Sequence, residues 1–207
     1  RTADNSSYCR CPRCAAETNA ADAAGMFSNS RYSDHVFNFA NTVAREVAKT
    51  HPDKTLSTLA YASYAYPPSF PLEKNISVGF CLHTRNIWSP GLQENDLKLF
   101  DAWAAKEKGR RFFLFLYYCF PAENSRYGDA WYAFPGFFSK GIEQWFKRFA
   151  AAGVRGAYFC GWGQDVEAYL TLKLLDDPAA PAEGILDDYF GGLYGPAGPA
   201  MKKVYRE

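Results

Sequence analysis

The sequence lacks several features that would each indicate a class of protein. No stretch of its 207 residues is long and apolar enough for a membrane span, which needs about 20 such residues. The net charge is only +1, so no excess of one sign favours nucleic acid or an anionic membrane surface. No phosphate-cradling glycine loop is present, and Gly161-Trp162-Gly163 lacks the serine of a nucleophile elbow. We therefore expect no nucleic acid partner and no membrane span.

Cysteine is too scattered for the framework of a small disulfide-rich protein, since three of the six lie in one cluster and three on apparent strands. The chain starts with neither a methionine nor a signal-like apolar stretch, so we expect an excised piece of a longer protein. We expect residues 1–207 to form one domain, with a cysteine-containing loop at 1–30 and a helical tail at 179–207.

Aromatic residues are abundant, at 17% of the chain, and the clearest strand is rich in them. The run from Arg110 to Pro121 is short and almost wholly apolar, which predicts a strand over 111–120 buried on both faces, as in a parallel sheet covered by helices. Similar patterns predict strands over 55–66, 76–82 and 154–160.

Helical periodicity separates these strands. Helices are predicted over 33–49, with Ser33 as N-cap and Val36, Ala40, Val43 and Val47 on one stripe, and over 95–108. A third helix ends at Gly153, a fourth begins at Asp165, and a final helical pair surrounds residues 194–197. The inward side chains are expected to be Leu99, Phe100, Trp103, Phe138, Ile142, Trp145, Phe149, Tyr169, Leu172 and Leu175.

Strands that alternate with helices predict an α/β fold with a parallel sheet. Four strands are too few for a closed eight-stranded barrel, so we expect a partial (β/α)8 TIM-type barrel, its second half, with the remaining half elsewhere in the parent chain. Ligands of such folds bind at the carboxyl ends of the strands.

Four segments resemble the glycoside-hydrolase-like domain of unknown function 4838, which is found in large secreted bacterial proteins. They are Asp4-Asn5 followed by Cys9, Cys11 and Cys14, then Asn95 to Lys106, then Glu167 to Pro178, and finally Tyr194-Gly-Pro-Ala197. The resemblance implies a barrel similar to those of α-glucuronidases and hexosaminidases, a carbohydrate partner (an oligo- or polysaccharide), and a secreted, periplasmic or cell-surface location. Gln164 departs from the pattern, because an acidic residue is expected in the loop after the last strand.

If the domain is a glycosidase, it needs two carboxyl groups, one as acid and one as nucleophile or base. Acidic residues at the predicted strand exits are Asp4, Glu123, Asp129 and Glu167, and we take Asp4 and Glu167 as the catalytic candidates. The plainer interpretation is that Asp4 caps a turn, Glu123 and Asp129 are solvated loop charges, and Glu167 lies in the first turn of a helix, where negative charge is favoured.

Aromatic and polar residues at the predicted exits are candidates for saccharide contacts, because sugar faces stack on rings and their hydroxyls need hydrogen-bond partners. His83 is equally well explained as a partly buried side chain bonded to a carbonyl. Only one of Tyr117 and Tyr118 can line a site, because adjacent strand residues face opposite ways. The candidates are Asn5, Tyr64, Tyr66, His83, Arg85, Tyr118, Trp131, Trp162 and Gln164.

Cys9, Cys11 and Cys14 place three thiols within six positions, which is half of a pair of zinc knuckles. A structural zinc ion would take its fourth ligand from His35, His83 or Cys81. A disulfide and free thiols are the alternatives. Three functions therefore remain: a glycoside hydrolase, a non-catalytic carbohydrate-binding module on the same scaffold, and a metal-stabilised structural module.

Overall fold

The structure is a computed structural model, and the residues it describes divide into two compact units. The first unit comprises Arg1–Leu82 and Pro90–Phe115, and the second comprises His83–Ser89 and Leu116–Glu207. The described residues are 8–19, 25–83, 86, 89–108, 112–118, 126–127, 130–131, 138–160 and 165–206.

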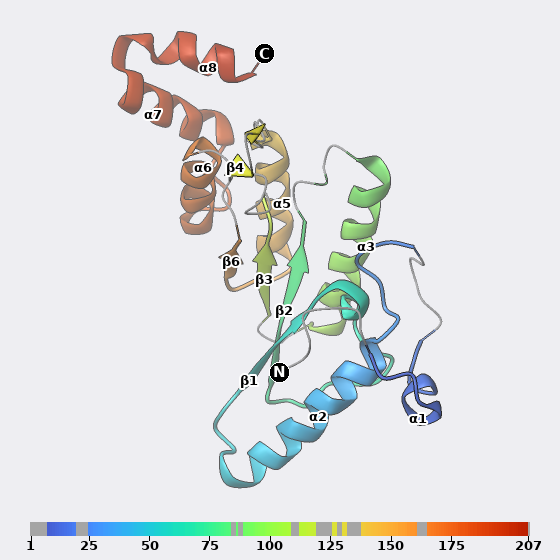
Figure 1. Ribbon diagram of the computed structural model, residues 1–207. Helices are drawn as coiled ribbons and strands as arrows, with labels where there is room; N and C mark the ends of the chain where they lie inside the picture. Colours follow the sequence, from blue (N-terminus) through green and yellow to red (C-terminus); the bar gives the residue numbers. More distant parts are fainter. Residues whose placement is uncertain are drawn as a thin grey trace. The chain divides into compact units, whose positions relative to one another are not determined.

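Four strands form one parallel sheet, as the sequence predicts, in the order β1-β2-β3-β6 (Figure 1). Strand β1 pairs with β2 in parallel, from Leu56 opposite Ile76 to Ala60 opposite Phe80. Strand β2 is buried along its length except at Gly79, which is half-buried, as expected for a strand covered on both faces. The fold is therefore mixed α/β, with flanking helices, and is consistent with part of a (β/α)8 barrel. The strands are β1 (Leu56–Ala60), β2 (Ile76–Leu82), β3 (Phe113–Leu116) and β6 (Ala157–Phe159).

Three strands are shorter than predicted. Strand β1 ends at Ala60 instead of residue 66, because Ala62 has a positive φ of 49° and a 3-10 turn, η1 (Ala62–Tyr64), follows. Strand β3 covers four residues, and Phe113 is 39% exposed while Leu114 is 2% exposed. The prediction that this strand is buried on both faces is therefore wrong at Phe113, and β6 is likewise confined to three residues.

The first unit packs its aromatic rings between the sheet and two long helices, α2 (Ser33–Thr50) and α3 (Pro90–Lys106). Phe80 of β2 stacks on Trp103 of α3, with ring centroids 6.2 Å apart. The Trp103 indole N–H donates to the carbonyl of Ala65 at 2.6 Å, so the buried ring has no unsatisfied donor. The predicted inward positions Leu99, Phe100 and Trp103 are confirmed, each at most 1% exposed.

Helix boundaries in this unit differ from the prediction for local reasons. Helix α3 begins at Pro90, five residues before the predicted Asn95, because proline suits the first helical position. Tyr32, not Ser33, is the N-cap of α2, and the buried Ser33 hydroxyl donates instead to the carbonyl of Tyr66 at 2.7 Å. The buried face of α2 differs from the predicted stripe, with which it shares Val36, and comprises Ser33, Val36, Phe37, Asn41 and Ala44.

The second unit is largely helical. Helix α5 buries the predicted residues Phe138, Ile142, Trp145 and Phe149, and Gly153 follows it with φ of 80°, the left-handed conformation expected of it. A short antiparallel pair, β4 (Arg126–Tyr127) with β5 (Ala130–Trp131), precedes α5. The helices are α5 (Ser139–Ala151), α6 (Asp165–Asp176), α7 (Ala182–Tyr194) and α8 (Gly198–Arg206), with the 3-10 turn η3 (Gly195–Ala197) joining the last two, as in the predicted final pair.

Helix α6 presents a different face from the one predicted. Leu172 and Leu175 are 57% and 41% exposed, and Tyr169 is half-buried, so the predicted inward set is wrong. The helix instead buries Val166, Glu167, Leu170, Thr171 and Leu174. Val166 joins a cluster with Leu186 and Phe190 of α7 and Tyr205 of α8, which shows that packing by the C-terminal helices decides the orientation.

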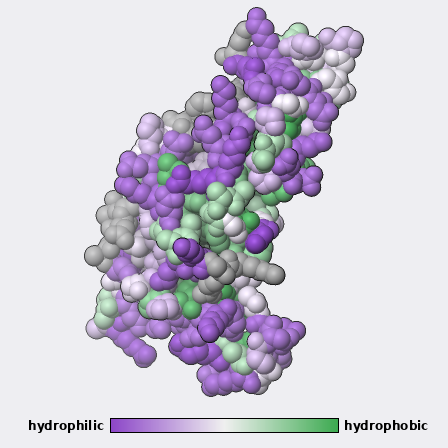
Figure 2. Space-filling view, turned by 180° about the vertical axis from the view of Figure 1, so that it is seen from behind, coloured by the Kyte–Doolittle hydropathy of each residue, from purple (hydrophilic) through white to green (hydrophobic). Residues whose placement is uncertain are grey.

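Helices α7 and α8 form a closely packed antiparallel pair (Figure 1). A Cβ on Gly198 would lie 2.7 Å from the carbonyl oxygen of Phe190, so only glycine permits this approach. The outer surface of the pair, at the upper right of Figure 2, is mostly hydrophilic. Lys202 of α8 joins the two helices by ion pairs with Glu183 of α7 at 3.0 Å and with Asp187 of α7 at 2.5 Å.

Candidate functional site

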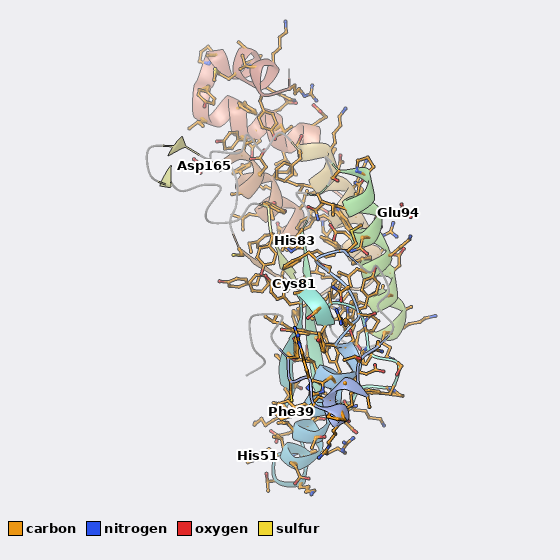
Figure 3. The ribbon with its side chains drawn as sticks, turned by 45° about the vertical axis from the view of Figure 1, so that its right-hand side comes forward. Phe39, His51, Cys81, His83, Glu94 and Asp165 are labelled. Carbon is orange, nitrogen blue, oxygen red and sulfur yellow. The ribbon has the colours of Figure 1, made fainter. Side chains whose placement is uncertain are left out.

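Two aromatic side chains meet where strands β2 and β3 end. His83 follows β2 directly, Tyr117 follows β3 directly, and their rings stack with centroids 4.7 Å apart and planes 9° apart. Figure 3 shows His83 just beyond Cys81 at the end of its strand. The end of β6 lies alongside, since the Cys160 N–H donates to the Leu116 carbonyl at 2.9 Å. This is the carboxyl edge of the sheet, where α/β folds place their ligands.

Of the two alternatives Tyr117 and Tyr118, Tyr118 was predicted to line the site, whereas Tyr117 is the residue that contacts His83. Tyr118 points the opposite way, is 1% exposed, and shares a 2.6 Å hydrogen bond with the hydroxyl of Thr171 on α6. Burial raises the pKa of Tyr118 well above its usual range, so the phenol stays neutral. A ligand-binding role for Tyr118 stays a prediction, but Tyr117 is the neighbour of His83.

Glu167, the predicted second carboxylate, is completely buried in the first turn of α6. One carboxylate oxygen accepts a 2.7 Å hydrogen bond from the Tyr205 hydroxyl of α8. Burial, and then the nearby Glu167 charge, raises the pKa of Tyr205. A carboxylate in this position joins two helices and would need a rearrangement before it could touch a substrate. Its catalytic role stays a prediction.

Tyr64 and Tyr66 lie in the first unit, in and just after the 3-10 turn that follows β1. Tyr64 is 4% exposed, and Tyr66 is 9% exposed with its hydroxyl donating to the Asn95 side-chain oxygen at 2.7 Å. The Asn95 amide in turn donates to the Ser28 carbonyl at 3.0 Å. Tyr66 therefore belongs to a buried network and Tyr64 is buried, and the predicted saccharide contacts of both stay predictions.

Several predicted residues cannot be placed. Trp131 lies on β5, but its side chain is not described. Asp4, Asn5, Arg85, Trp162 and Gln164 lie outside the described residues, as do Glu123 and Asp129, so the predicted pairing of Asp4 with Glu167 stays a prediction.

The three N-terminal cysteines form a cluster that can hold a metal ion. The sulfur atoms of Cys9, Cys11 and Cys14 all lie within 4.8 Å of one another, with Cys9 and Cys11 exposed. Helix α1 (Pro12–Ala15) produces this arrangement, because it brings Cys11 and Cys14 onto one side of a single turn. The three are free thiols in the structure, and no other described His, Cys, Asp or Glu joins the group.

Electrostatics within the cluster distinguish the thiols. The backbone N–H of Cys14, and then the side chains of Cys9 and Cys14, donate to Cys11 and lower its pKa to about 7. The pKa of Cys14 rises to about 11, chiefly because its thiol is hydrogen-bonded to Cys11. Thiolates are the metal-binding form, so Cys11 is the thiol best prepared to bind a metal at neutral pH.

The N-terminal segment is attached to α2 on both sides of the cluster. Tyr8 stacks on Tyr32, with ring centroids 3.9 Å apart, and burial raises the pKa of Tyr8. After the cluster, Glu17 accepts from His35 Nδ1 at 2.7 Å, so this nitrogen of one of the three candidates for the fourth ligand is engaged elsewhere. The cluster therefore sits in a segment held by two side-chain contacts.

Comparison with known proteins places the chain in a family. A family model described as a domain of unknown function, DUF4838, matches residues 2–206, so the chain belongs to this family, as the four resembling segments predict. No curated protein and no solved structure matches the sequence. Among the described residues, none of the helices is long and apolar enough to cross a membrane.

Proposed function

We propose that this DUF4838 domain binds carbohydrate at the carboxyl edge of its parallel sheet. The observation that carries the proposal is the stacked pair of His83 and Tyr117 at the ends of β2 and β3. Rings at strand ends contribute small apolar contacts to a sugar, together with N–H and O–H groups for its hydroxyls. The resemblance to carbohydrate-active barrels gives the same ligand class.

Burial of the pair limits what it contributes. His83 is 6% exposed and Tyr117 is 9% exposed, so a saccharide would contact only a small part of each residue. The remaining contacts would come from the loops that follow the same strands. The sequence places Arg85 and Trp162 in those loops, and both are part of the proposal as predictions.

Binding is favoured over hydrolysis. A glycosidase needs two carboxyl groups about 5 to 10 Å apart on either side of the scissile bond. Glu167 is 0% exposed and engaged by Tyr205, and Gln164 takes the place of an expected acid. We therefore propose that the domain is a carbohydrate-binding module. A glycosidase is the second candidate function, which requires two catalytic carboxyl groups in addition to binding.

A glycan array probed with the chain, followed by calorimetric titration of the best oligosaccharide, tests the proposal. Tyr117→Ala is expected to weaken binding at least tenfold, equivalent to about 1.4 kcal/mol, because it removes one of the two rings. Phe39→Ala, which truncates an aromatic ring that is 59% exposed on α2, is the control and should bind normally. Failure to bind any glycan would refute the proposal.

Product analysis then separates the two variants. If the bound glycan is cleaved, Asp4→Asn should abolish product release and keep binding, because the amide preserves size but cannot act as an acid or base. Activity that survives this substitution would remove Asp4 from the catalytic candidates. Binding without any cleavage by the unmodified chain supports the module.

We also propose that the cysteine cluster holds a structural zinc ion. The close approach of three sulfur atoms supports this proposal. A metal that binds only the folded chain stabilises it by about 2.7 kcal/mol when its free concentration is 100 times the dissociation constant. Zinc should therefore raise the melting temperature of the reduced protein. The increase should disappear in Cys11→Ser and persist in Cys160→Ser, whose cysteine lies outside the cluster.

A further inference from the structure

The first unit contains a small polar pocket that includes none of the predicted site residues. It is formed where the segment after α1 passes the N-terminal half of α2, and it is an open depression with a volume of about 230 Å³. Figure 1 shows α1 close to that end of α2. The polar and aromatic residues that line the pocket are Glu17, Thr18, Asn19, Asp34, Asn38 and Phe70.

Hydrogen bonds fix the walls of this pocket before any ligand arrives. The Asp34 carboxylate accepts from the Ser69 N–H and from the Ser69 hydroxyl, both at 2.7 Å, which joins α2 to the segment carrying Phe70. The Asn19 side-chain oxygen accepts from the Asp34 N–H at 3.3 Å, and the Asn19 N–H donates to the Arg31 carbonyl at 2.9 Å. Three separate segments are thus held in register, so little ordering is needed on binding.

Acceptor oxygens remain available in the pocket. An ionised carboxylate has about four lone-pair positions, and each Asp34 oxygen accepts one of the two bonds from Ser69. Glu17 has one oxygen paired with His35, and its side chain is 37% exposed. The Thr18 hydroxyl donates to the Ala15 carbonyl at 2.8 Å and can accept from a ligand. The exposed Asn38 adds an amide, and Phe70 adds an apolar surface.

This combination selects a class of ligand. Carboxylates and amides around one aromatic side chain suit a ring with several hydroxyl groups and an apolar face. The volume lies below the range of about 300 to 1,000 Å³ typical of drug-sized ligands, so a single sugar unit is the appropriate size. The two carboxylates favour an ammonium substituent over a carboxylate on the ligand. Lys106, which interacts electrostatically with Asp34, and His35, which is bonded to Glu17, reduce this preference.

We infer that this pocket binds one neutral or amino-substituted sugar unit, separately from the strand-end site. The inference rests on the proposed carbohydrate function for its ligand class only, since the pocket belongs wholly to the first unit, whereas His83 and Tyr117 belong to the second. The cysteine cluster lies directly before one wall, because Cys14 is two residues from Ala16.

The test uses the complete chain with three probes: methyl glucosaminide, methyl glucoside and methyl glucuronide. Chemical-shift changes of the backbone amides of residues 16–19, followed by titration, report binding at this pocket. We expect affinity to fall in the order amino sugar, neutral sugar, uronate. Asp34→Asn should weaken the amino sugar roughly tenfold or more, because it removes a charge-assisted hydrogen bond.

Glu46→Gln is the matched control, because Glu46 lies on the same helix and the substitution removes the same charge. The Glu46 side chain is 65% exposed and paired with Lys49. If both variants weaken binding equally, general electrostatic attraction explains the result and the pocket is refuted. Three further results would overturn the inference. They are the absence of saturable shifts with all three probes, tighter binding of the uronate than of the other two probes, and displacement of the sugar by Ca²⁺, which would indicate a cation site.

Tyr117→Ala distinguishes failure of this inference from failure of the proposed function. If that variant loses oligosaccharide binding but keeps the monosaccharide-induced chemical-shift changes at residues 16–19, the two sites are independent. Monosaccharide binding at the pocket, together with no effect of Tyr117→Ala on the array, would refute the strand-end site alone.

Discussion

Two regions of the molecule hold chemically similar side chains in opposite environments. In the N-terminal segment and α2, Cys9 and Cys11 are exposed and the Glu17 side chain is 37% exposed. Between α6 and α8, Glu167 is 0% exposed and bonded to Tyr205. An exposed acid can meet a ligand, whereas a buried one chiefly joins structural elements, so burial separates candidates that look equivalent in sequence.

The largest effect on stability is expected when the buried contact between Tyr205 and Glu167 is removed. Tyr205→Ala should lower the free energy of unfolding by about 3 to 5 kcal/mol, because it removes an aromatic ring from the core and the donor to Glu167. Urea denaturation measures the change. Tyr205→Phe separates the two contributions and should cost about 1 to 3 kcal/mol, since it leaves the carboxylate without that donor. A neutral Tyr205→Phe would mean that Glu167 does not depend on this bond.

The next effect tests how tightly the buried region is packed. Gly198→Ala should cost about 1 to 3 kcal/mol, because the new methyl group would lie 2.7 Å from the Phe190 carbonyl oxygen. Gly192→Ala on α7 is the control, since nothing lies within 4 Å of its position. That substitution should be neutral or slightly stabilising. Equal melting temperatures for the two variants would refute the close approach of α7 and α8.

Alkaline pH should destabilise the buried region selectively. Burial raises the pKa of Tyr118 in the folded state above its unfolded value of about 10. The unfolded chain therefore loses this proton first, so the stabilisation is complete below pH 10 and declines as pH rises beyond it. The slope is at most about 1.4 kcal/mol per pH unit for each such tyrosine. Tyr118→Phe should flatten the decline of melting temperature between pH 9 and 11.

In the exposed region the corresponding substitution should matter little. Glu17→Gln breaks the half-exposed pair with His35 and should change stability by less than about 1 kcal/mol. A loss as large as that of Tyr205→Phe would contradict the division between the two regions. Urea denaturation at neutral pH gives the comparison directly.

The smallest predicted effect concerns reactivity instead of stability. Iodoacetamide should alkylate Cys11 of the reduced, metal-free protein with a midpoint near pH 7, because the Cys14 N–H stabilises the Cys11 thiolate. Peptide mapping by mass spectrometry identifies the modified thiol. Faster alkylation of Cys14 than of Cys11 would reverse the assignment, since the Cys14 pKa is raised to about 11.

Much of the fold could be predicted where one physical signal dominates. Strand β2 was predicted with its observed bounds, because its apolar run is continuous and ends in polar residues. Gly153 was predicted to end a helix because few other residues adopt its φ of 80° without strain. Strand β1 was predicted too long, since the Ala and Tyr residues after Ala60 resemble a strand although Ala62 turns the chain.

Features that depend on a tertiary neighbour could not be predicted in this way. Helix α6 has leucines on more than one side, and only α7 and α8 decide which are buried. Burial of Glu167 likewise depends on Tyr205, 38 residues further along the chain. The pocket beside α2 has no periodic signal, because Glu17, Asp34 and Phe70 come from three separate segments. Alternation of side chains could have identified Tyr117, had Tyr118 been assigned to the core first.

The division of the chain between its units has a practical consequence for anyone who shortens the gene. Residues 83–89 belong to the second unit, although residues 90–115 of the first follow them. Expressing 116–207 alone would remove His83 and leave the Tyr117 ring without the imidazole on which it stacks. A fragment that preserves the strand-end pair must begin before His83 and retain α3, so this pair cannot be studied on a minimal C-terminal piece.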